Sequence, residues 1–272
     1  MDLTYAREPE MKPYVITVCH QKGGVAKTTT ASALGAALAE QNHPTLLIDL
    51  DPSANLTAGL GISPRQVRKS AADLLLGNDH LSAVYQSTEF PGIDIVPSGP
   101  DMSTASQMLA LRPQYETILR RNLNGQELTH EFIILDCPPA MATITTAALS
   151  AADLAIIPTQ CEYFAIQAIN SIFGFIRQVR ADHNPQLSYK LLITMFDLRG
   201  KLHTQLYKKL ENYYAEALFT TIIGFDSKLR ASQIAGQPIT VYASKTRAAE
   251  QYRNLAKEIY AYVQERRIQR PD

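Results

Sequence analysis

Residues 14–29, YVITVCHQKGGVAKTT, decide how this chain folds. The apolar run Tyr14–Cys19 predicts a buried strand, and the segment Thr28–Gln41 has the length of a helix. A short loop containing two glycines joins them. Such a loop turns backbone N–H groups and the positive end of the following helix toward one point, so it can hold a phosphate. The stretch therefore predicts a phosphate-binding loop between a strand and a helix.

The loop follows the spacing Gly-x-x-x-x-Gly-Lys-Ser/Thr with two departures. Lys22 stands where the first glycine is usual, and Ala26 stands where the last glycine is usual. We expect Ala26 to be tolerated with its backbone at negative φ. The loop residues expected to contact ATP are Lys22, Gly23, Gly24, Val25, Ala26, Lys27, Thr28 and Thr29.

Two lysines in one phosphate loop need separate roles. We expect Lys27 to bridge the β- and γ-phosphates and the hydroxyl of Thr28 to ligate Mg²⁺. Lys22 is a second cation close to the phosphates. It can neutralise the γ-phosphate of its own nucleotide or that of a nucleotide held by a facing subunit. In the second case ATP would join two copies of the chain.

Two further apolar runs end in carboxylates. The strand Phe132–Leu135 leads into Asp136, which suits a residue that holds Mg²⁺ through water. The run from Leu46 ends in Asp49 and Asp51, two residues apart and on one side of the strand. A carboxylate at such a strand end faces the γ-phosphate and can orient the attacking water, which makes Asp51 a candidate catalytic residue beside Lys22 and Lys27.

The rest of the chain repeats the same alternation of strand and helix. Apolar runs that predict buried strands alternate with helix-length segments such as Ala165–Ala181, His203–Ala217 and Arg247–Arg266. The remaining strands are expected at Thr45–Ile48, Ile93–Val96, Leu154–Ile157 and Leu191–Met195. This order predicts an α/β fold with a doubly wound, mostly parallel sheet flanked by helices, in which ligands bind at the carboxyl ends of the strands.

We expect one domain over residues 13–268, an N-terminal extension over 1–12 and a tail over 269–272. The segment 59–100 is richer in turn residues and is expected to decorate the rim of the sheet.

The composition gives no sign of a strongly basic nucleic-acid-binding protein, a cysteine-based metal site or a membrane-spanning protein. Lys+Arg and Asp+Glu both number 26, so any nucleic-acid binding must come from a local patch. The three cysteines form no metal-binding pattern, and we expect buried, reduced thiols. No apolar run reaches the length that spans a bilayer and no signal segment precedes the first strand, so we expect a soluble, intracellular protein.

Several motifs together resemble the ParA/Soj partition ATPases. Residues 21–30 (QKGGVAKTTT), 47–52 (LIDLDP) and 135–139 (LDCPP) are similar to the deviant Walker A, A′ and B motifs of that family. Residues 158–165 (PTQCEYFA), 194–197 (TMFD), 248–252 (AAEQY) and 255–258 (LAKE) extend the resemblance over nearly the whole chain.

The resemblance implies a cycle of ATP binding, DNA binding and ATP hydrolysis. Two protomers sandwich two ATP molecules with Mg²⁺, with Lys22 of each reaching the nucleotide of the other. The dimer binds DNA without sequence preference, and a ParB-like or other adaptor protein stimulates slow hydrolysis. The resemblance also implies that Asp51 orients water, that Asp49 supports the metal, and that the protein lies in the cytoplasm at the nucleoid. The cargo can be a plasmid, a chromosome or a large protein assembly.

DNA contacts of the family map onto Arg199 and Lys228, with Arg230, Lys245 and Arg247 as neighbouring candidates. Two motifs depart from the family: Ser53 replaces a frequent glutamine, and residues 223–226 (IGFD) replace an Ile-Pro-Arg stretch near the adenine. We expect Phe225 to stack on the base.

Two alternative functions are compatible with the same ATP-binding fold. A MinD-like membrane ATPase needs a C-terminal amphipathic helix with an apolar face open to lipid. A metabolic enzyme on this scaffold, such as a nitrogenase-type reductase or a ligase of the dethiobiotin synthetase kind, needs cluster-holding cysteines or a pocket for an organic substrate.

Overall fold

The computed structural model describes residues 12–77, 79–124, 128–163, 165–197 and 199–269. The N-terminal extension and the tail expected from the sequence lie outside these residues, apart from Lys12 and Gln269.

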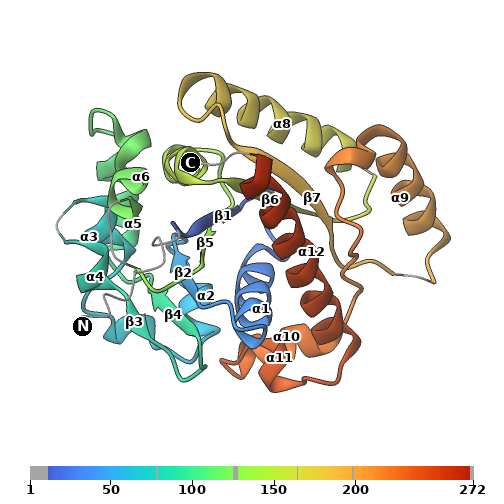
Figure 1. Ribbon diagram of the computed structural model, residues 1–272, viewed down its shortest axis with the longest axis horizontal. Coiled ribbons are helices and arrows are strands. Elements are labelled where there is room, and N and C mark those ends of the chain that lie inside the picture. The colour runs from blue at the N-terminus through green and yellow to red at the C-terminus, as the bar shows by residue number, and fades with distance from the viewer. Residues whose placement is uncertain (1–11, 78, 125–127, 164, 198, 270–272) are drawn as a thin grey trace, which may run out of the picture.

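Within the described residues, a seven-stranded sheet forms the centre of the molecule (Figure 1). The spatial order is β3-β4-β2-β5-β1-β6-β7, and each neighbouring pair is parallel except β3 with β4. The strands are β1 (Tyr14–Val18), β2 (Thr45–Asp49), β3 (Gln86–Ser87), β4 (Ile93–Val96), β5 (Phe132–Asp136), β6 (Leu154–Thr159) and β7 (Ser188–Ile193). The predicted doubly wound, mostly parallel sheet is confirmed.

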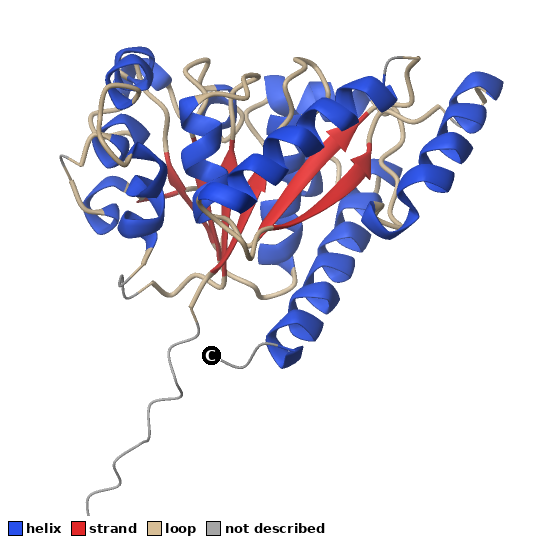
Figure 2. Cartoon of the chain, turned by 90° about the horizontal axis from the view of Figure 1, so that it is seen from above, coloured by secondary structure: helices blue, strands red, loops and turns tan. Residues whose placement is uncertain are grey.

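Helices cover both faces of the sheet (Figure 2). On one face, α1 (Lys27–Glu40) and α12 (Arg247–Gln269) pack side by side on the apolar residues of the central strands. The opposite face is covered by α5 (Met102–Leu109), α6 (Ile118–Leu123), α7 (Thr143–Ala151) and α8 (Ala165–Asp182). Because both faces are buried, the residues of β1, β2 and β5 are buried throughout.

The segment 59–100 includes β3 and β4 and lies at the edge of the sheet that β3 forms (Figure 1). It follows α2 (Asn55–Ala58) and contains the 3₁₀ turn Pro64–Gln66, α3 (Ala71–Leu75) and α4 (Leu81–Val84). A capping box starts α3, in which the Ser70 hydroxyl accepts from Ala72 and the Asp73 carboxylate accepts from the Ser70 N–H. The chain also contains α9 (Lys201–Tyr214), α10 (Ser227–Ile234), α11 (Ile239–Tyr242) and 3₁₀ turns at Tyr115–Thr117 and Ala215–Ala217.

Most predicted strands are found with their ends shifted by at most two residues, and two strands differ more from the sequence prediction. The edge strand β3 was not predicted, because two exposed residues give no periodicity to detect. The last strand was predicted over Leu191–Met195, but β7 begins at Ser188 and ends at Ile193. An edge strand tolerates polar residues at its open side, and the backbone of Met195 turns left-handed at φ 52°, which ends the strand.

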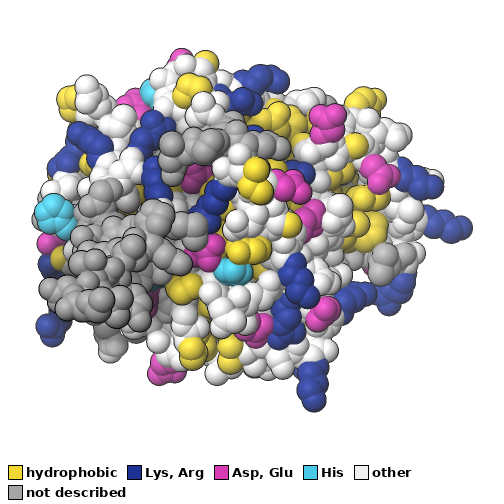
Figure 3. Space-filling view, viewed as in Figure 1, with side chains coloured by type: hydrophobic (Ala, Val, Ile, Leu, Met, Phe, Trp, Pro, Cys, Tyr) yellow, Lys and Arg dark blue, Asp and Glu magenta, His cyan; other side chains and the backbone are white. Residues whose placement is uncertain are grey.

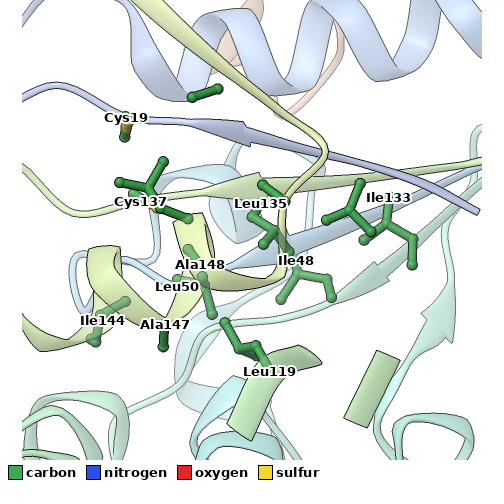
Figure 4. Close-up of a cluster of buried hydrophobic side chains, with 14 of the residues drawn as sticks. Cys19, Ile48, Leu50, Leu119, Ile133, Leu135, Cys137, Ile144, Ala147 and Ala148 are labelled. Atoms are coloured by element: carbon green, nitrogen blue, oxygen red, sulfur yellow. The ribbon is translucent and has the colours of Figure 1, made fainter. Parts of the chain in front are cut away.

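The core beneath α7 contains two of the three cysteines. Figure 4 shows Cys19 and Cys137 next to Leu50, Leu135 and Ile144, at the end of the sheet that carries the phosphate loop. Cys19, Cys137 and Cys161 are all buried and unpaired, as expected. Burial raises the pKa of Cys19 to about 12 and that of Cys161 to about 11, so these thiols stay protonated near neutral pH.

The apolar face of the long C-terminal helix α12 packs against α1. Its buried residues recur at helical spacing: Ala248, Ala249, Tyr252, Leu255, Ala256, Ile259 and Val263. In the part of the chain that the structure describes, no helix combines the length and the apolarity needed to cross a membrane.

Candidate nucleotide-binding site

The carboxyl ends of β1, β2, β5 and β7 surround a cavity of about 710 Å³. Parallel strands place these ends at one edge of the sheet, where ligands of doubly wound folds bind. The floor comes from the phosphate loop, the acidic side from the loop after β2, and the far wall from residues 223–234. The lining includes Gly23, Gly24, Ala26, Lys27, Thr28, Thr29, Asp51, Ser53, Pro139, Thr194, Met195, Phe225, Asp226, Leu229, Arg230, Gln233, Ile234 and Tyr252.

Side chains of the residues that directly follow β6 and β7 hold the phosphate loop from behind. The Gln160 amide donates to the carbonyl of Gly24 at 3.0 Å, and the Thr194 hydroxyl donates to the carbonyl of Val25 at 3.1 Å. With its carbonyls bound on this side, the loop presents its N–H groups to the cavity. Val25 itself is buried and does not line the cavity. We did not assign Gln160 and Thr194 this role from the sequence, although both lie in motifs that carry the family resemblance.

The backbone of Ala26 contradicts our expectation. We expected negative φ, but Ala26 has φ 70° and ψ 33°, in the left-handed region. Gly24 is also left-handed, at φ 75°. The loop must turn this way to lead from β1 into α1, and alanine accepts the turn at a cost of about 1–2 kcal/mol. Ala54 and Met195 are left-handed as well and lie in loops beside the cavity, where such strain is commonly found.

Replacing Ala26 by glycine should therefore stabilise the protein. Ala26→Gly is expected to raise the free energy of unfolding by about 0.5–1 kcal/mol, since relief of the strain exceeds the added entropy of the unfolded chain. Urea unfolding of the nucleotide-free protein measures it. The matched control is Ala261→Gly, on an exposed turn of α12, which should lower stability by about 0.5–1 kcal/mol. Equal losses in both variants would show that Ala26 is not strained.

Lys27 is the buried cation of the site. It is 7% exposed, and its ammonium donates to the carbonyl of Lys22 at 3.3 Å. It begins α1, so its charge lies next to the positive end of that helix. No carboxylate of the described residues is bonded to it, so this buried cation is arranged to receive an anion.

Lys22 points to a different partner. Its ammonium forms an exposed ion pair with Glu162, in the loop between β6 and α8, and Lys22 does not line the cavity. Its N–H donates to Nδ1 of His20 at 2.9 Å. Burial and the charges of Lys27 and Lys22 lower the pKa of His20 to about 4, which keeps this acceptor neutral. Within one chain the two lysines therefore have different surroundings.

The three carboxylates divide into distinct environments. Both oxygens of Asp49 are hydrogen-bonded: it accepts from the N–H of Asp51 and from the N–H and hydroxyl of Thr57 at 2.7–3.1 Å. Asp51 lines the cavity and accepts from the N–H of Ser53 at 2.8 Å. Asp136 is fully buried, and neither carboxylate oxygen has a hydrogen-bond partner among the described residues. Asp136 is thus the acid with free ligand capacity, whereas Asp49 shapes the loop that carries Asp51.

Burial and mutual repulsion raise the pKa of two of these acids. Asp49 and Asp136 are paired neighbours in the β2–β5 register. Burial, then the charge of Asp49, raises the pKa of Asp136 well above its ordinary value, and the nearby Thr28 hydroxyl and Lys27 act in the opposite direction. The pKa of Asp49 is raised to about 6, chiefly by burial. A divalent cation bound here would favour the charged forms.

Asp136→Asn should stabilise the metal-free protein in a pH-dependent way. The unfolded chain loses the Asp136 proton near pH 4, whereas the folded protein keeps it to higher pH, so native stability falls as pH rises between the two pKa values. Asparagine removes that loss. We expect a gain of about 1–3 kcal/mol at pH 8 and little at pH 4, measured by chemical unfolding in EDTA. A gain that is the same at both pH values would contradict the raised pKa.

The far wall of the cavity is built by residues 223–234. Phe225 is 62% exposed and lines the cavity, and Arg247 donates to its carbonyl at 3.0 Å, which holds the loop. The side chain of Asp226 caps α10 by accepting from the N–H of Lys228 at 2.9 Å. Tyr252 closes the base of this wall and hydrogen-bonds Thr30 at 3.2 Å.

The basic candidates for DNA contact have different surroundings. Lys228 and Lys245 are exposed, and Arg199 is exposed while paired with Asp197 at 3.3 Å. Arg230 is exposed and also lines the cavity, and Arg247 is exposed while it donates to the carbonyl of Phe225. In Figure 3, Lys and Arg side chains also project along the edge formed by α9, where Lys201, Lys208 and Lys209 are exposed.

The fold and this site together define a phosphate-loop nucleotide-binding protein of the doubly wound α/β class. A family model described as an AAA domain matches residues 13–189.

Curated relatives narrow the class. The chain is 34% identical over 248 residues to the sporulation initiation inhibitor protein Soj of Bacillus subtilis, covering 91% of this chain and 98% of that protein. It is 33% identical over 261 residues to the chromosome partitioning protein ParA of Caulobacter vibrioides, covering 93% and 96%. The chain belongs to the ParA/Soj family of partition ATPases.

A solved structure extends the similarity to the whole fold. A protein from Mycobacterium smegmatis described as cobyrinic acid a,c-diamide synthase, with a bound ATP analogue and magnesium, superposes with a TM-score of 0.81 at 31% identity. The match covers 93% of this chain and 96% of that one.

Proposed function

We propose that this protein is an ATPase that dimerises on ATP, binds DNA without sequence preference and positions or segregates a cargo. The observation that carries the proposal is the cavity itself. It brings together a buried lysine and a phosphate loop with left-handed turns, and the unsatisfied buried carboxylate of Asp136 ends β5 at the same edge of the sheet, as ATP with Mg²⁺ requires. The relatives that match nearly the whole chain are described as partition proteins.

ATP and Mg²⁺ fit the residues present. Lys27 and the N–H groups of the loop would hold the phosphates, the Thr28 hydroxyl would ligate the metal, and Asp136 would bind it through water. The two bare oxygens of Asp136 support this assignment, and the saturated oxygens of Asp49 leave that residue a supporting role. Bound Mg²⁺ supplies neutralising charge to the β- and γ-phosphates.

Asp51 is the acid placed to orient the attacking water. It lies in the cavity wall and is 7% exposed, while Ser53 fixes one of its oxygens. One carboxylate oxygen thus stays available to a water molecule. Hydrolysis needs that water in line with the γ-phosphate, so we propose slow turnover that an adaptor protein of the ParB kind accelerates.

Dimerisation is proposed through Lys22. Its ammonium lies outside the cavity of its own chain and is paired with a surface carboxylate, so it can exchange that partner for an anion of a second copy. Two-fold symmetry would then use both lysines, one for each nucleotide. The base would stack on Phe225, which is exposed in the far wall.

DNA binding is proposed through the exposed cations Arg199, Lys228 and Lys245. Joining two copies doubles the number of phosphate contacts, and affinity for DNA rises steeply with that number. A membrane-binding alternative is less well supported, because the apolar face of α12 is buried against α1 up to Val263. We therefore propose a cytoplasmic protein that associates with the nucleoid.

DNA binding with ATP, ADP or no nucleotide tests the function. Wild type should bind random-sequence duplex only with ATP, with an affinity that falls as salt rises. Asp51→Ala should bind ATP but stay on DNA as a trapped dimer. Arg199→Glu with Lys228→Glu should keep the ATP-dependent dimer and lose about tenfold or more in DNA affinity. Equal DNA affinity in all nucleotide states would overturn the proposal.

An assay of ADP production separates the enzyme alternative. The M. smegmatis similarity favours an ATP-dependent amide-forming enzyme as the second candidate. That reading requires ADP production that depends on an organic acid and an amide donor and does not respond to DNA with an adaptor.

A further inference from the structure

One hydrogen bond joins the far wall of the cavity to the helix that follows the phosphate loop. The Gln233 amide nitrogen on α10 donates to the Thr29 hydroxyl on α1 at 2.8 Å, between residues 204 positions apart. Both residues are half-buried and both line the cavity. The bond therefore borders the space in which a nucleotide would lie.

The direction of this bond decides what Thr29 can still do. A threonine hydroxyl has one proton to donate and lone pairs that accept, whereas an amide NH₂ group only donates. Gln233 thus uses the oxygen of Thr29 as acceptor and leaves its proton free. That proton can go to an acceptor inside the cavity, and phosphate oxygens only accept.

The position of Thr29 indicates which phosphates it would meet. It lies in the first turn of α1, where N–H groups and the helix dipole attract anions. Lys27, two residues earlier, is the residue expected at the β- and γ-phosphates. Thr29 is bonded to the wall that holds Phe225, the candidate for base stacking. It would therefore face the part of the phosphate chain nearer the base, which ATP and ADP share.

We propose that Gln233 is a positioning residue that directs the Thr29 hydroxyl toward the phosphates of the bound nucleotide. The chain from Gln233 to Thr29 to phosphate runs in one direction, and hydrogen bonds aligned in this way strengthen one another. This inference rests on the proposed nucleotide site. It adds a residue that neither the phosphate-loop spacing nor the motifs of the chain assign.

The bond also ties the nucleotide to α10, the helix that carries Lys228 and Arg230. A phosphate that engages Thr29 stabilises the position of α10 seen here. Because coupling between two binding sites is reciprocal, DNA held by Lys228 would raise nucleotide affinity by the same factor that nucleotide raises DNA affinity.

Three variants test the role by titration with fluorescent ATP and ADP. Gln233→Leu removes the donor and should weaken both nucleotides about 2- to 12-fold. Gln233→Glu keeps a bond between α10 and α1, because Thr29 can donate to the carboxylate, but it takes the proton and adds negative charge. It should weaken both nucleotides more than leucine does. The matched control, Gln237→Leu, is exposed and outside the cavity, and should bind as wild type does.

The Thr29→Val background shows whether Gln233 acts through the hydroxyl. There, Gln233→Leu should cause no further loss, whereas independent roles would give additive losses. A merely structural clamp predicts the opposite order, with glutamate tolerated and leucine harmful, and this order would overturn the proposal. So would wild-type affinity in Gln233→Leu. If wild type itself binds neither nucleotide, the proposed function fails; if wild type binds and the variants match it, only this inference fails.

Discussion

Lys27→Ala should abolish measurable nucleotide binding. Lys27 is buried at the start of α1 with its ammonium on the carbonyl of Lys22, and no carboxylate in the described part of the chain is bonded to it. In the complex it would be the cation buried against the β- and γ-phosphates. Truncating one partner of such a buried charge pair costs about 2–5 kcal/mol, or about 30- to 5,000-fold in the dissociation constant. Calorimetric titration with ATP and Mg²⁺ measures it.

Two controls separate binding from folding. Lys27→Met keeps the aliphatic stem of the buried side chain and removes only the charge, so it should fold and still lose the nucleotide. Lys208→Ala removes an exposed lysine on α9 and should bind ATP normally. If Lys27→Met binds ATP with wild-type affinity, the assignment of the phosphate loop is wrong.

Lys22→Ala should separate nucleotide binding from dimerisation. The Lys22 ammonium lies outside its own cavity, so its removal should change ATP affinity of the monomer less than about threefold. In the dimer it would make a charge-assisted bond to the partner's nucleotide, worth about 1.5–3 kcal/mol. Two-fold symmetry counts that bond twice, so the dimer should weaken about 100-fold or more. ATP-dependent DNA binding should be lost with it.

Sedimentation with ATP, in the slowly hydrolysing Asp51→Ala background, measures the loss of dimerisation. Lys208→Ala in the same background is the matched loss of one exposed lysine and should dimerise fully. A dimer that forms equally well without Lys22 would show that the second lysine serves only its own subunit, which the sequence leaves open.

Short-range patterns in the chain were sufficient for most of the fold. β1, β2 and β5 are mostly apolar runs buried on both sides, so their residue composition alone indicates a parallel sheet. β3 and the start of β7 lie at the sheet edges, where polar residues are allowed and the pattern fades. The same reasoning placed the loop, Asp51 and Asp136 at one edge, because parallel strands end together.

The phosphate loop and the acids that follow β2 and β5 could be predicted from sequence alone, since their geometry depends on a strand, a turn and a helix adjacent in the chain. Only the tertiary structure decided which of these carboxylates lacks hydrogen-bond partners. Asp49 and Asp136 look equivalent in sequence, but Thr57 saturates the first and nothing in the described residues saturates the second. It also revealed the left-handed Ala26, the pairing of Lys22 with Glu162 and the bond from Gln233 to Thr29. Ala26 depends on how the loop must turn to join β1 to α1, and the other features depend on residues brought together from distant parts of the chain.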